Sequence, residues 1–110
     1  MRYVFVVAVL MMFSLNAAAL PSHDEEVVYF EDSTMSSIVG EKIVALCGIG
    51  RVNQMIFGTT SEYRVVIKTP CPGQTPVDAS CSIFSPLYAG TYACNNLAMC
   101  EILGPYANCD

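Results

Sequence analysis

The chain has 110 residues, with ten acidic and five basic side chains and a formal net charge of −5 at pH 7. Residues 20–110 contain four of the basic and all ten of the acidic residues, so their net charge is 4 − 10 = −6. This balance argues against nucleic acid and anionic membranes as partners, because both need clustered basic residues. A chain of this length forms one domain with a modest core.

Residues 1–19 have the three parts of a secretory signal peptide. Arg2 provides a basic start, residues 3–15 are apolar apart from Ser14, and three alanines at 17–19 form a small-residue cleavage site. The apolar run is too short to span a membrane comfortably. The sequence therefore predicts cleavage after Ala19, secretion to the extracellular space and no membrane association afterwards.

Residues 20–36 carry five of the ten acids and the only histidine, His23. This composition predicts a solvated acidic N-terminal arm or a propeptide. The apolar run at 27–30 also allows an edge strand.

Three runs beyond this arm are typical of strands, because they are rich in β-branched and other apolar residues. They cover residues 42–47, 52–57 and 63–68. Prolines and a glycine at 70–79 indicate a loop, since proline fixes its own backbone and disfavours helix just before it.

The C-terminal third has weaker signals. Residues 82–89 show no clear period, and 92–94 would fit one short strand. Residues 95–103 favour one or two helical turns that begin at an asparagine cap and end at Gly104. Together these patterns predict an α+β fold over 37–110, a small disulfide-stapled domain of short strands with one or two short helical segments.

Six cysteines in so short a secreted chain are most simply three disulfides. Six cysteines allow fifteen pairings, and their spacing alone does not choose among them. They are Cys47, Cys71, Cys81, Cys94, Cys100 and Cys109.

The sequence offers no pattern for catalysis, and we expect no enzyme activity and no cofactor. No C-x-x-C or H-x-x-x-H spacing is present, so no metal site is expected. Because His23 is the only histidine, any Ser–His–Asp or Cys–His catalytic arrangement would have to use it. The glycines are scattered singly, which excludes a phosphate-binding loop.

The C-x12-C-x5-C spacing that ends at Cys100 resembles the galactose/rhamnose-binding lectin domain of sea-urchin egg lectins, the SUEL type. The resemblance covers about 37–110. Matching segments are 40–47, Tyr63 and Arg64 eight residues before Cys71, 94–100, and 104–109. The chain departs from the family at Gly40, where the first cysteine would stand, and it lacks the family's final strand and last cysteine.

The resemblance implies calcium-independent binding of rhamnose or galactose, with Glu41 as the carboxylate and Tyr63 as the tyrosine of the sugar site. It also implies the disulfides Cys81–Cys109 and Cys94–Cys100, which leaves Cys47 and Cys71 to pair with each other. A scaffold that has lost sugar binding is one alternative. The other is a small secreted effector, toxin or inhibitor that binds a protein, so the expected partner is a carbohydrate or an extracellular protein.

Overall fold

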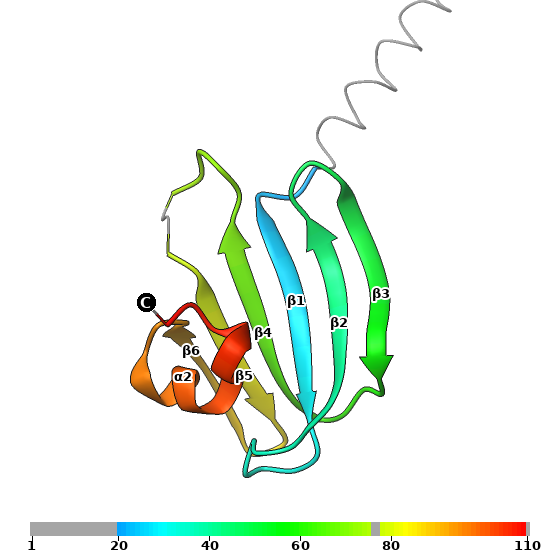
Figure 1. Cartoon of the computed structure of the whole chain (residues 1–110), viewed down its shortest axis with the longest axis vertical. Coiled ribbons are helices and arrows are strands. Elements are labelled where there is room, and N and C mark those ends of the chain that lie inside the picture. Colours follow the sequence, from blue (N-terminus) through cyan, green and yellow to red (C-terminus); the bar gives the residue numbers. More distant parts are fainter. Residues whose placement is uncertain (1–19, 76–77, 110) are drawn as a thin grey trace, which may run out of the picture.

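Six antiparallel strands form one sheet in the computed structural model, which describes residues 20–75 and 78–109 (Figure 1). The predicted signal peptide lies outside these residues. A short helix and a 3-10 turn follow the last strand. The predicted strands, short helix and disulfides are therefore present, but the fold is mostly sheet rather than an even α+β mixture. The elements are β1 (His23–Phe30), β2 (Ile38–Leu46), β3 (Gly50–Gly58), β4 (Tyr63–Pro70), β5 (Ser80–Ser85), β6 (Tyr88–Ala93), α2 (Leu97–Leu103) and η1 (Gly104–Tyr106).

Within residues 20–36, expected as a solvated arm or propeptide with an edge strand allowed at 27–30, His23–Phe30 form the inner strand β1. The sheet order is β3-β2-β1-β4-β5-β6, so β1 pairs with β2 on one side and with β4 on the other. Its four consecutive apolar residues at 27–30 are all buried, because the side chains of this inner strand alternate between two faces and pack against side chains of the neighbouring strands on each. Removing this segment as a propeptide would remove the middle of the sheet.

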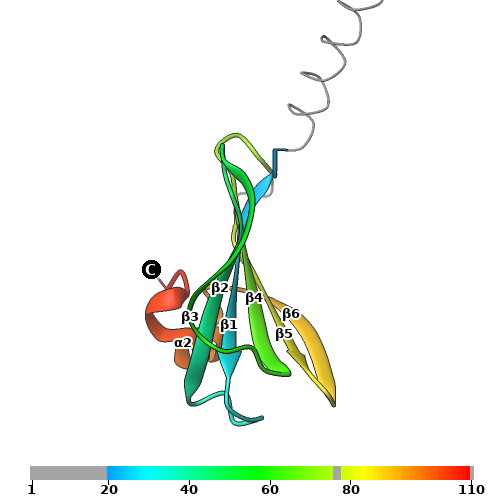
Figure 2. The ribbon, with the colours of Figure 1, turned by 90° about the vertical axis from the view of Figure 1, so that its right-hand side faces the viewer.

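One face of the sheet carries the main core, and we call it the helix-covered face. Figure 2 shows α2 and η1 packed on this side of the sheet. Val28 and Phe30 of β1 point to it and are 0% and 1% exposed, and Met99 and Leu103 of α2 close over them. Burial of these apolar side chains is the main term that holds the short helix in place.

The opposite face, which we call the open face, has no described helix over it (Figure 2). Val27 and Tyr29 of β1 and Val44 of β2 form a second, smaller apolar cluster there. Val44 is the extra residue of a β-bulge in β2, because Ala45 pairs with Glu25 and Ile43 pairs with Glu26. The bulge places Val44 on the open face together with its neighbour Ala45.

The three disulfides are Cys47–Cys71, Cys81–Cys94 and Cys100–Cys109. Cys47–Cys71 is the pairing predicted once the lectin resemblance had assigned the other four cysteines. The other two replace the implied Cys81–Cys109 and Cys94–Cys100, which are wrong. Three disulfides are compatible with an extracellular protein.

The physical reason for the correction is the hairpin of β5 and β6, which the sequence patterns did not show. Cys81 lies opposite Tyr92 in that hairpin, and the backbone N–H of Cys94 donates to the carbonyl of Ala79 at 3.1 Å. These contacts hold the Cα atoms of Cys81 and Cys94 5.0 Å apart, within the range that a disulfide needs. Cys100 is then left for Cys109, which η1 brings back to α2.

The helix α2 begins where the sequence predicted, at an asparagine cap. The side-chain oxygen of Asn96 accepts a hydrogen bond from the backbone N–H of Ala98 at 2.9 Å. Leu97 is 77% exposed, and the buried side of the helix is formed by Met99 and Leu103. Among the described residues, no helix has the length and apolar character to cross a bilayer.

Candidate functional site

Glu41 lies on the helix-covered face of β2 with a second glutamate close to it. Its register partner is Val28, a residue of the main core. Glu26, two residues before Val28 on β1, therefore points to the same face and is a diagonal neighbour of Glu41. The two carboxylates come from adjacent strands, and both glutamates are half-buried.

The two carboxylates influence each other. Burial raises the pKa of Glu26 above its ordinary value of 4.5, and the negative charge and hydrogen bonding of Glu41 raise that pKa further. A carboxyl group in these conditions holds a proton more readily than one in water, because a second negative charge beside it is unfavourable. Glu26 therefore keeps its proton, and with it the capacity to donate a hydrogen bond, to a higher pH than an isolated carboxyl group does.

Tyr106 of η1 lies near the two glutamates on the helix-covered face. Burial raises the pKa of its hydroxyl, and the charges of Glu41 and Glu26, with hydrogen bonding to Glu41, raise that pKa further. The hydroxyl consequently stays protonated and serves as a donor. Its backbone position is fixed by the main core, against which Tyr106 packs, and by the Cys100–Cys109 disulfide that encloses η1.

A hollow of about 170 Å³ adjoins Glu26. Its lining contains three acidic residues and a threonine as well as aliphatic residues, a combination that suits a ligand with both hydroxyl groups and apolar C–H surface. Its lining is Asp24, Glu25, Glu26, Ile43, Ala45, Leu46, Ile67 and Thr69.

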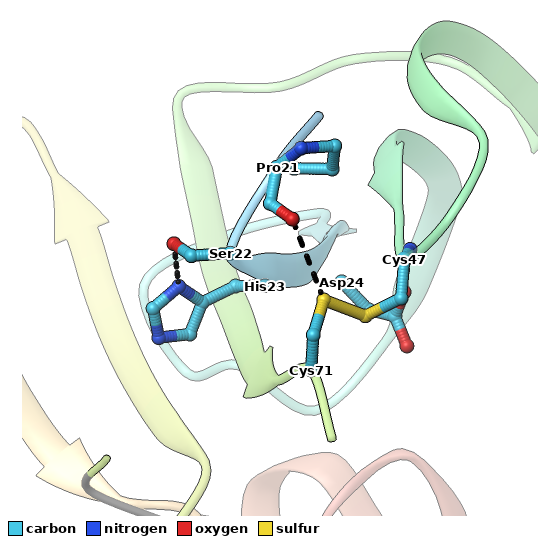
Figure 3. The surroundings of a disulfide bond; sticks show 6 residues. All are labelled: Pro21, Ser22, His23, Asp24, Cys47 and Cys71. Carbon is cyan, nitrogen blue, oxygen red and sulfur yellow. Dashed lines mark hydrogen bonds between the residues drawn. A yellow bond between two sulfur atoms is a disulfide. The ribbon is translucent and has the colours of Figure 1, made fainter. Parts of the chain in front are cut away.

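Asp24 at the end of this hollow already has a structural partner. One of its carboxylate oxygens accepts a hydrogen bond from the backbone N–H of Cys47 at 2.6 Å. Figure 3 shows Asp24 beside the Cys47–Cys71 disulfide. Asp24, Cys47 and Cys71 lie close enough together to suggest a metal site, but the two sulfurs are bonded to each other. Since a thiolate is the form of cysteine that binds metal, this group is a structural junction.

Tyr63, the other residue of the predicted sugar site, is on the same face but away from Glu41. It lies opposite Phe30 on β4 and packs against the main core. Glu41 is on the far side of β1, two strand spacings away, or about 10 Å across the sheet. The structure therefore does not bring Glu41 and Tyr63 together.

Glu26 and Tyr106 are the neighbours of Glu41 in the candidate site, and neither was predicted from the sequence. Glu26 precedes the apolar run at 27–30, which could have marked β1 as an inner strand paired to the strand of Glu41. We find no signal in the sequence that places Tyr106 there, because its position depends on how α2 docks.

The chain matches no protein-family model, no curated protein and no solved structure. The resemblance to the SUEL-type lectin domain therefore stays a prediction, and the assignment of function starts from the residues described above.

Proposed function

We propose that the protein is a secreted, calcium-independent carbohydrate-binding protein whose sugar site is formed by Glu26, Glu41 and Tyr106 with the adjoining hollow. The observation that carries this proposal is the pair of interacting carboxylates beside a tyrosine hydroxyl, next to a hollow with an aliphatic wall. The SUEL-type resemblance supplies the sugar class, rhamnose or galactose.

The chemistry follows from the donors and acceptors present. The Glu41 carboxylate accepts hydrogen bonds from two neighbouring sugar hydroxyls, and such charge-assisted bonds are stronger than neutral ones. The hydroxyl oxygen of Tyr106, whose own proton is directed to Glu41, accepts a hydrogen bond from a third sugar hydroxyl, while the half-buried Ile43 contacts the apolar face of the ring. Calcium needs six to eight oxygen ligands, more than this small group supplies, so the proposed site uses direct hydrogen bonds.

Isothermal titration of the secreted protein with L-rhamnose and with D-galactose, in EDTA, tests the proposal. We expect binding of one of these sugars, and Glu41→Gln should weaken it about tenfold or more, since two charge-assisted hydrogen bonds become neutral ones. Glu62→Gln, at an exposed position between β3 and β4, is the matched control and should leave the affinity unchanged. Absence of binding to both sugars, or equal losses in the two variants, would refute the proposal.

A second candidate function is binding of a protein target, as the effector, toxin or inhibitor alternative requires. The observation that favours it is the distribution of basic residues on the open face. That surface is separate from the carboxylate pair.

A further inference from the structure

All four basic residues of the described chain lie on the open face, although the protein as a whole is acidic. Their partners in the sheet register show this: Lys42 is opposite Val27 and Arg64 is opposite Tyr29, and Val27 and Tyr29 belong to the open-face cluster. Lys68 lies opposite Glu25 and forms an ion pair with it at 3.5 Å. Arg51 lines the same hollow as Lys68 and Glu25.

Most of this positive charge has no internal partner. Within residues 20–75 and 78–109, the Lys68–Glu25 pair is the only ion pair, although nine acidic residues are present there. The Arg64 guanidinium instead lies 4.6 Å from the centre of the Phe84 ring. Three cations on one face are therefore free to meet carboxylates from outside.

The same face offers apolar contact beside the cations. Val27 and Tyr29 are buried, and Met55 and Val66 are half-buried against them. A hollow of about 280 Å³ opens at one end of the face, with Val44 and Ala45 in its wall and Arg51, Lys68 and His23 around it. In Figure 3 the His23 ring lies beside Ser22, whose hydroxyl is 2.7 Å from Nδ1.

We propose that the open face binds an acidic, partly apolar segment of a partner protein. The segment's carboxylates meet Lys42, Arg51 and Arg64, and one of its apolar side chains enters the hollow. About eight extended residues would cross the five strand spacings of the sheet, so a short peptide is long enough to engage the whole face.

Other occupants fit less well. A second copy joined face to face by a twofold axis would oppose cation to cation, which is unfavourable. Nucleic acids and sulfated polysaccharides need dense, continuous positive charge, whereas the four cations here are separated by apolar side chains.

The test is fluorescence anisotropy of a labelled peptide of about twelve residues in which Glu and Tyr alternate, a length that exceeds the span of the sheet. We expect binding that weakens with salt. Lys42→Gln with Arg51→Gln should lower the affinity about tenfold, the loss expected for two partly exposed charge pairs. The control, Thr60→Glu with Asn95→Asp, changes the net charge equally but at exposed loop positions, and we expect less than about a threefold loss, because only screened long-range charge changes.

Three results would overturn the proposal: no binding of the peptide, equal losses in the two double variants, or preferential binding of a heparin oligosaccharide. The sugar titrations with Glu41→Gln address the helix-covered face, and although the two hollows share Glu25 and Ala45, neither double variant changes a residue of the sugar site. Failure of one proposal is therefore distinguishable from failure of the other.

Discussion

Removing the Cys81–Cys94 disulfide is predicted to destabilise the protein more than removing Cys47–Cys71, although it closes a shorter loop. The double variants are Cys81→Ala with Cys94→Ala and Cys47→Ala with Cys71→Ala. Loop-closure entropy and burial rank these two disulfides in opposite orders. The comparison therefore shows which effect dominates in this small core.

Loop-closure entropy favours Cys47–Cys71. The sequence separations are 24 for Cys47–Cys71, 13 for Cys81–Cys94 and 9 for Cys100–Cys109. The chain-entropy relation assigns them about 3.5, 2.9 and 2.6 kcal/mol respectively. On this term alone, the Cys81–Cys94 variant would be the milder of the first two.

Burial reverses the order. Cys81 and Cys94 are 0% and 1% exposed and belong to the main core, whereas Cys47 and Cys71 are half-buried. Replacing two fully buried sulfurs by hydrogen loses about 1 kcal/mol of transfer free energy at each, and the cavity they leave adds to this loss. The expected cost is about 5 kcal/mol for the Cys81–Cys94 variant, against about 3.5–4 kcal/mol for the Cys47–Cys71 variant.

Equilibrium unfolding in urea under non-reducing conditions measures the difference. A loss of about 5 kcal/mol is close to the whole net stability of many small domains, so this variant should be partly unfolded without denaturant. The Cys100→Ala, Cys109→Ala variant is the control for a short loop with one exposed sulfur and should cost least. If the Cys47–Cys71 variant proves less stable than the Cys81–Cys94 variant, loop entropy dominates and the reasoning from burial is wrong.

Three further predictions concern single residues. Because the folded state raises the pKa of Glu26, its ionised form destabilises the fold at neutral pH; this penalty is absent below the ordinary value of 4.5 and develops as the pH rises through the raised pKa. Glu26→Gln should therefore increase the free energy of unfolding at pH 7 but not at about pH 3.5, and urea titrations at the two pH values would contradict this if the gain were equal. Asn96→Ala removes the cap of α2 and should cost about 1 kcal/mol in thermal unfolding, while Asn95→Ala, at the exposed neighbouring position, should change little. Gly40→Ala would bring the new Cβ into the backbone of Thr59 and should lower the free energy of unfolding by more than about 3 kcal/mol. Gly73→Ala, at a residue with positive φ and open space around it, should lower it by about 1 kcal/mol. Similar melting temperatures for the two variants would refute the clash.

The strands with local signals were predictable. The β-branched runs at 42–47, 52–57 and 63–68 correspond to parts of β2, β3 and β4, and the asparagine cap gave the start of α2 within a residue. These elements are encoded locally, by residue type and by a capping side chain. The inner position of β1 is a tertiary property, and the acids at 24–26 concealed it, although four consecutive apolar residues after them are typical of a strand covered on both faces.

The β5–β6 hairpin was missed because its open-face positions other than Phe84 are small or polar, which weakened the apolar signal. Ser80 and Ser82 nevertheless alternate with Cys81 and Ile83, a period of two that could have revealed β5 and with it the Cys81–Cys94 bond. The candidate site was predictable only in Glu41. Its neighbours depend on strand register and on the docking of α2, which no local pattern specifies.

The sheet order has a consequence for the synthesis of the protein. The inner strand β1 is made first, but its second neighbour, β4, is complete only about 40 residues later. At roughly 5–20 residues per second this interval lasts about 2–8 s. During that time the nascent chain exposes the apolar residues at 27–30 and one unpaired strand edge, the kind of surface that recruits chaperones or other nascent chains. A ribosomal pause between residues 46 and 63 would lengthen this exposure, whereas the same pause after residue 70 would not.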